Sequence, residues 1–95
     1  MSKKTADKLS GMMRYNVINE YGESRFSGME LCAKSGTAEV DGKGAHSWFV
    51  GFSQREDFPV AFVVVAEHGG GGSKVAGSVA SKVLKKCAEE MNVEL

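Results

Sequence analysis

Four consecutive residues, Lys34, Ser35, Gly36 and Thr37, are the part of this 95-residue sequence best suited to binding chemistry. An ammonium group and two hydroxyl groups can donate hydrogen bonds to one carboxylate, and bonds that involve ionised groups are the stronger ones. A glycine within a strand lets another backbone or a ligand approach closely. The simpler interpretation of Lys34 is a solvated lysine on an edge strand, where it discourages unwanted pairing. The surrounding elements must decide between these interpretations.

Charge, cysteine and histidine content exclude several other functions. The sequence has 12 Lys and Arg against 12 Asp and Glu, so it lacks the basic excess of a nucleic-acid-binding protein. Its two cysteines and two histidines are too widely spaced for a structural zinc site, and we expect neither a metal nor a cofactor. The longest apolar run, 60–66, is far shorter than the stretch of about 20 residues that a membrane span requires.

Two segments have the three-and-four spacing of apolar residues that is typical of an amphipathic helix. The first covers 2–21, with Ser2 as N-cap and Gly22 after its last turn. Its apolar stripe is expected to be Ala6, Leu9, Met13 and Val17. The second covers 73–91, follows a four-glycine connector at 69–72 and begins with Ser73 as N-cap. Its stripe is expected to be Val75, Ala76, Val79, Ala80, Val83, Leu84, Cys87, Ala88 and Met91.

Three segments between the helices are predicted to be strands. They cover 29–40, 46–53 and 60–67, and the strongest turn signal between them is Asp41-Gly42-Lys43-Gly44. Strands joined by such short turns form an antiparallel meander. We therefore predict an α+β fold with the order αβββα in a single domain, 1–95, with both helices packed on one face of a three-stranded sheet.

Both faces of the predicted sheet are apolar. Trp48, Val50 and Phe52 point one way along the second strand, and Phe49 points the other way. A half-solvated antiparallel sheet would alternate apolar with polar residues instead. Because two helices can cover only one face, we expect something outside this chain to cover the other.

The two cysteines are predicted not to pair. Cys87 belongs to the stripe of the last helix, whereas Cys32 shares its strand face with Lys34 and Gly36. A disulfide requires Cα atoms within about 7 Å, and the sheet separates these two positions.

The motif and its surroundings resemble the C-terminal part of the penicillin-binding transpeptidase domain, a member of the serine D,D-transpeptidase and β-lactamase-like superfamily. In that family the third active-site motif is Lys-Thr/Ser-Gly, often followed by Thr-Ala. Here the residues read Ala33-Lys34-Ser35-Gly36-Thr37-Ala38-Glu39. The next strand, His46-Ser47-Trp48-Phe49-Val50-Gly51-Phe52, fits the family pattern His-x-Trp-Phe-x-Gly-Phe. The glycine-rich turn before the last helix also matches, so the likeness extends from about Ser2 to Leu84.

The resemblance implies a role for each motif residue. Lys34 would hold the terminal carboxylate of the substrate, and the hydroxyls of Ser35 and Thr37 would bind the same group. Gly36 would let the strand edge approach the nucleophile and the substrate. The backbone N–H of Thr37 would form half of the oxyanion hole. The substrate peptide would lie along this edge as an added strand.

Two of the three family motifs are absent from the sequence. No lysine has a serine three residues before it, so the nucleophile motif Ser-x-x-Lys is missing, and Ser-x-Asn is missing too. An oxyanion hole without a nucleophile cannot form an acyl-enzyme. We therefore expect no catalytic residue in this chain. The sequence is predicted to be an inactive C-terminal segment of a larger domain with a partial β-lactamase/transpeptidase-like fold.

The resemblance also implies the setting of the complete protein. It would crosslink peptidoglycan stem peptides, bind β-lactams and be anchored to the cytoplasmic membrane with this domain outside, while the segment itself would be soluble. The implied strand order is 60–67, 46–53, 30–40, and the missing N-terminal part of the domain would continue the sheet beyond 60–67. Left open, that edge is expected to pair with a second copy. The alternatives are a β-lactam sensor or β-lactamase as parent, and a stand-alone module that binds peptides along its exposed strand edge.

Overall fold

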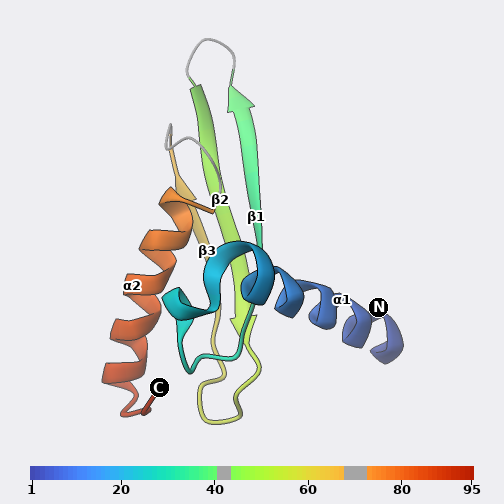
Figure 1. The fold of residues 1–95 in the computed structure, drawn as a ribbon, viewed down its shortest axis with the longest axis vertical. Coiled ribbons are helices and arrows are strands. Elements are labelled where there is room, and N and C mark those ends of the chain that lie inside the picture. Colours follow the sequence, from blue (N-terminus) through green and yellow to red (C-terminus); the bar gives the residue numbers. More distant parts are fainter. Residues whose placement is uncertain (41–43, 68–72) are drawn as a thin grey trace.

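The computed structural model describes residues 1–40, 44–67 and 73–95 (Figure 1). Its elements are, in chain order, α1 (Lys3–Asn16), the π-helical segment η1 (Val17–Gly22), the 3-10 helix η2 (Glu23–Phe26), β1 (Leu31–Val40), β2 (Gly44–Ser53), β3 (Ala61–Ala66) and α2 (Val75–Glu90). The predicted α+β order αβββα is confirmed. The turn expected at 41–43 and the glycine connector expected at 69–72 lie outside the described residues.

The three strands form one antiparallel sheet in the order β1-β2-β3, as the sequence predicts. Residues directly opposite one another share a face of the sheet. Ser35 pairs with Phe49, which pairs in turn with Val64, and these residues lie on the face covered by α2 and the short helical segments. Lys34 lies opposite Val50 on the other face.

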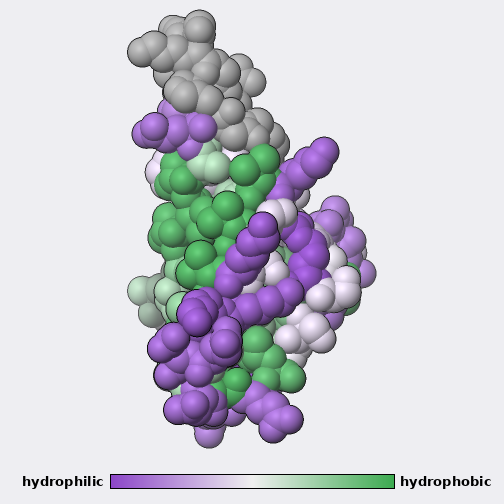
Figure 2. All heavy atoms as spheres, turned by 90° about the vertical axis from the view of Figure 1, so that its left-hand side faces the viewer, coloured by the Kyte–Doolittle hydropathy of each residue, from purple (hydrophilic) through white to green (hydrophobic). Residues whose placement is uncertain are grey.

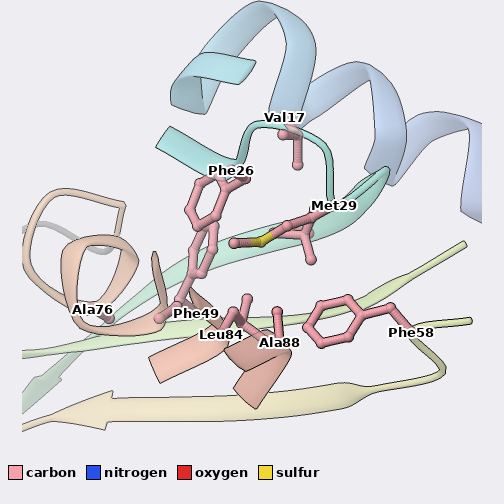
Figure 3. Packing of buried hydrophobic residues seen from close by; sticks show 11 residues of the cluster. Val17, Phe26, Met29, Phe49, Phe58, Ala76, Leu84 and Ala88 are labelled. Atoms are coloured by element: carbon pink, nitrogen blue, oxygen red, sulfur yellow. The ribbon is translucent and has the colours of Figure 1, made fainter. Parts of the chain in front are cut away.

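The core lies between the sheet and the helical segments (Figure 3). Phe49 of β2 is fully buried at its centre and meets three other aromatic rings. The Phe26 ring stacks on it at 5.7 Å, the Phe62 ring tilts against it at 5.8 Å, and the Tyr21 ring meets it edge-on at 5.1 Å. Such ring pairs add stabilisation beyond the area they bury.

The first helix differs from the predicted one in its length and in its packing. Ser2 caps it as expected, since its hydroxyl accepts a hydrogen bond from the Thr5 N–H. The α-helix ends at Asn16, however, and no residue of α1 is buried; of the expected stripe, only Val17 in η1 is buried. Figure 1 shows the cause, because the first turns of α1 run past the edge of the sheet and have nothing to pack against.

The last helix buries one row of small side chains and leaves a second apolar row exposed. Ala76, Ala80, Leu84 and Ala88 face the core, whereas Val75, Val79 and Val83 stay 37%, 42% and 50% exposed. Its predicted N-cap, Ser73, is wrong: the helix begins at Val75, and no side chain of its N-cap residue bonds the first turn. The hydroxyl of Ser47 in β2 accepts the hydrogen bond of the Ala76 N–H instead. One of the N–H groups at the start of the helix is thus satisfied by the sheet.

The second face of the sheet remains apolar and partly exposed, as predicted. Trp48 is 39% exposed, and Val63 and Val65 of β3 are 66% and 42% exposed. Figure 2 views the molecule from the side that carries α2 in Figure 1, and on this side too apolar residues gather beside a band of hydrophilic ones. A contiguous apolar patch on a small protein indicates an interaction surface.

Both cysteines are free, which confirms that they do not pair. Cys32 differs from expectation in another respect, because its side chain is fully buried within this chain. The end of α1, which packs on β1, supplies its charged neighbour, Arg14. Separately, none of the helices in the described ranges is long and apolar enough to cross a bilayer.

Candidate functional site

The Lys-Ser-Gly-Thr motif lies on β1, an outer strand of the sheet, with β2 as its strand neighbour. Lys34 and Thr37 are exposed, and Ser35 and Gly36 are half-buried. Within the described part of the chain no pocket forms beside these residues. The motif therefore lies on an outer strand edge, where a ligand or another part of a protein can bind.

The register divides the motif between the two faces of the sheet. Lys34 shares the open face with Val50, whereas Ser35 shares the helix-covered face with Phe49. Because the strand is at the edge, both side chains can reach a ligand that lies alongside it, one from each face. The sequence predicted the four residues as a group, and the structure keeps them together on one strand.

The ammonium group of Lys34 lies against its own strand. Its Nζ donates a hydrogen bond of 2.6 Å to the backbone oxygen of Ser35. An ammonium group carries three hydrogens, so this bond leaves two for an anionic ligand. The positive charge is thereby held at the backbone of its own strand, next to the Ser35 carbonyl.

Three side chains from α1 and η1 hydrogen-bond to the outer backbone edge of β1, which the sequence analysis did not foresee. The bonds are Arg14 Nη1 to the Leu31 oxygen at 2.9 Å, Asn16 Nδ2 to the Ala33 oxygen at 3.2 Å, and the Ser35 N–H to Tyr21 Oη at 2.8 Å. We call Leu31–Ser35 the capped edge. An added peptide strand can therefore bond to β1 only beyond Ser35. No sequence pattern identifies these partners. Arg14 and Asn16 look like solvent-exposed residues of a helix, and Tyr21 lies beside the apolar stripe of that helix.

Nothing in the described ranges 1–40, 44–67 and 73–95 requires a glycine at position 36. Its backbone is not among the described glycines with positive φ, which are Gly22 and Gly28. A Cβ added to Gly36 would meet the Trp48 Cβ at 3.7 Å, an ordinary van der Waals contact. If a glycine is needed here, the need arises from something that approaches β1 from outside.

Cys32 lies two residues before the motif lysine but is poorly suited to nucleophilic chemistry. Burial raises the pKa of its thiol, and the nearby Arg14 charge acts in the opposite direction but more weakly. A thiol with a raised pKa holds little of the reactive thiolate at neutral pH. As for metals, no group of three or more His, Cys, Asp or Glu side chains in the described ranges could hold an ion.

Comparison with known proteins identifies the family. The family model of the penicillin binding protein transpeptidase domain matches residues 1–85. This chain therefore belongs to the penicillin-binding protein transpeptidase family, as the sequence motif indicates. Among curated proteins no match is found.

A solved structure supports the same assignment. The fold is similar to the crystal structure of the D,D-transpeptidase domain of a peptidoglycan glycosyltransferase from Eggerthella lenta, with a TM-score of 0.77 and 34% sequence identity. The match covers 94% of this chain but 21% of that chain. The chain thus spans about a fifth of the length of the structure it resembles.

Proposed function

We propose that this chain forms the C-terminal part of a penicillin-binding D,D-transpeptidase that crosslinks peptidoglycan stem peptides and is acylated by β-lactams. The observation that carries the proposal is the position of Lys34–Thr37 on an open outer strand, within a chain that matches the family over 1–85. In this proposal the complete protein is anchored to the cytoplasmic membrane and this domain lies outside it. A stand-alone peptide-binding module is less well supported, because the chain matches the transpeptidase domain family over 1–85.

In the proposed reaction the motif binds the substrate and stabilises charge, while the remainder of the domain supplies the nucleophile. Lys34, Ser35 and Thr37 hold the terminal carboxylate of the stem peptide. A serine Oγ from a Ser-x-x-Lys motif attacks the adjacent carbonyl carbon, the peptide C–N bond breaks, and the serine proton passes to the leaving amine. The backbone N–H of Thr37 donates to the oxyanion that forms transiently. Gly36 leaves room for these groups to approach.

The 95-residue chain alone is expected to form no covalent adduct with penicillin, because its sequence contains no Ser-x-x-Lys. Intact-mass spectrometry after incubation with excess benzylpenicillin measures this directly. When the chain is joined to a transpeptidase remainder that carries Ser-x-x-Lys, a stoichiometric adduct is expected. A mass increase on the chain alone would contradict the proposal.

The same assay tests the motif. In the joined protein, Lys34→Ala should slow acylation by about 10- to 100-fold, since it removes a charge-assisted hydrogen bond to the carboxylate. Lys82→Ala is the matched control, because Lys82 is equally exposed but lies on α2. Equal rates for the two variants would show that Lys34 does not bind the carboxylate.

The β3 edge is the proposed attachment site for the missing part of the domain and, in its absence, for a second copy. β3 pairs with β2 on one side, and its residues Ala61–Ala66 include neither a charge nor a proline. Such an edge is a template for strand pairing. Antiparallel pairing of two β3 strands about a twofold axis closes a dimer and covers part of the exposed Val63 and Val65 surface.

The isolated chain is accordingly expected to be a dimer at tens of micromolar in size-exclusion chromatography with light scattering. Val63→Lys should shift it to a monomer, because an edge lysine opposes strand pairing. Met12→Lys is the control, since Met12 is similarly exposed (63%) but lies on α1. A monomeric wild type at this concentration would contradict the homodimer.

A further inference from the structure

We propose that Tyr21 is a positioning residue that orients the Ser35 hydroxyl toward the substrate carboxylate. This inference rests on the proposed function and adds a residue outside the Lys-Ser-Gly-Thr motif. Tyr21 makes two hydrogen bonds to one residue of the motif: its Oη accepts from the Ser35 N–H at 2.8 Å and lies 3.0 Å from the Ser35 Oγ.

Either hydroxyl could donate in the second bond, and the chemistry of the two groups favours Tyr21 as the donor. A tyrosine hydroxyl has one hydrogen to donate, and one of its lone pairs is occupied by the Ser35 N–H. A phenol is a stronger acid than an aliphatic alcohol and is the better donor of the pair. With Tyr21 donating to the Ser35 Oγ, the serine hydrogen is left to point away from Tyr21. That hydrogen then donates to a carboxylate bound at the strand edge.

The Tyr21 ring is itself held in place by the core. It meets Phe49 edge-on at 5.1 Å with an interplanar angle of 77°. Arg25 Nη1 donates to the Tyr21 backbone oxygen at 3.3 Å, and Arg25 Nη2 donates to the Ser73 oxygen at 3.1 Å. The tyrosine is thereby tied to β2 through its ring and to the segment before α2 through its backbone.

The π-helical geometry of η1 is part of this arrangement. A π-helix bonds residues five apart, so its turn is wider than that of an α-helix, and such turns are frequent at functional sites. Tyr21 is the fifth residue of η1, and Gly22 ends the segment with φ of +94°. A continued α-helix would carry the residue at position 21 to a different azimuth and away from β1. The unusual turn therefore serves to bring the hydroxyl to Ser35.

The test uses Tyr21→Phe, which keeps the ring and removes the hydroxyl, with Tyr15→Phe on the exposed side of α1 as control. In the joined protein, acylation by a fluorescent penicillin should slow about three- to tenfold in Tyr21→Phe and stay unchanged in Tyr15→Phe. In a Ser35→Ala background, Tyr21→Phe should have less than a twofold further effect, because the tyrosine acts through that serine. Hydrogen exchange of the 95-residue chain should show a several-fold faster Ser35 amide in Tyr21→Phe alone.

The outcomes separate this inference from the proposed function. A wild-type joined protein that reacts normally while Tyr21→Phe reacts equally fast overturns the positioning role only. A further slowing by Tyr21→Phe in the Ser35→Ala background also overturns it, because the tyrosine would then act by another route. A wild type that penicillin does not acylate overturns the proposed function and the role of Tyr21 with it. An unchanged Ser35 amide in the chain alone removes the contact on which the inference depends.

Discussion

Phe49→Ala is expected to lower the free energy of unfolding by about 3–5 kcal/mol, the usual cost of truncating a buried phenylalanine. Phe49 is fully buried and joins three rings from three different elements, so the cavity cannot be filled by one neighbour. Domains of this size are stable by only about 5–15 kcal/mol, and the variant should be largely unfolded at modest urea concentrations. Urea unfolding followed by circular dichroism measures the difference.

Trp48→Ala is the matched control for Phe49→Ala. The two residues are adjacent on β2 but point to opposite faces, and Trp48 is 39% exposed. Its truncation should cost less than half as much in the monomer, because much of the ring is already in contact with water. A loss as large as that of Phe49→Ala would mean that the open face is covered in solution.

Gly51→Ala is also expected to be strongly damaging, with a loss of about 3 kcal/mol, through a steric mechanism rather than a cavity. A Cβ on Gly51 would collide with the backbone oxygen of Cys32 and lie 3.1 Å from Ala33 Cα. Both of these atoms belong to the neighbouring strand, β1. The clash can therefore be relieved only if β1 and β2 separate locally. Thermal unfolding followed by circular dichroism measures the loss.

Gly36→Ala provides the comparison within the same sheet. Its added methyl would make an ordinary contact of 3.7 Å with Trp48 Cβ, so its free energy of unfolding should change by less than about 1 kcal/mol. Similar losses for the two glycine variants would show that backbone freedom, rather than the Cys32 contact, governs both.

The strands were predictable because the alternation of their apolar residues shows which side chains share a face of the sheet. The alternation of Trp48, Phe49 and Val50 predicts two opposed apolar faces, and in the structure Phe49 lies on the face that the helices cover. The short turns make the meander the natural topology. The motif was predictable for a different reason, since consecutive residues on one strand stay together in any correct fold.

The helices were less predictable because periodicity shows which side of a helix is apolar but not what lies beneath it. Leu9 follows the pattern of a core residue, yet it is 42% exposed on a helix whose first turns extend past the edge of the sheet (Figure 1). On α2 the pattern offers an alanine row and a valine row side by side. The alanine row is buried, since small side chains allow the helix to approach the sheet closely.

The missed contacts of the site share a physical cause. The Ser47 bond to Ala76 and the Tyr21 bonds to Ser35 join residues 29 and 14 positions apart through side chains. Such contacts depend on the final packing of the elements and leave no periodic trace in the sequence.

The capped edge also sets a limit to assembly. Arg14, Asn16 and Tyr21 occupy the outer backbone of β1 as far as Ser35, whereas no strand in the described part of the chain pairs with the outer side of β3. If two copies join through β3, the resulting sheet has a β1 strand at either end, and each end is blocked to a further strand along Leu31–Ser35. The side chains of α1 and η1 thus oppose the pairing of another strand with the capped edge of β1. Growth is expected to stop at the dimer rather than continue into a fibre, which requires a receptive edge at both ends of every unit.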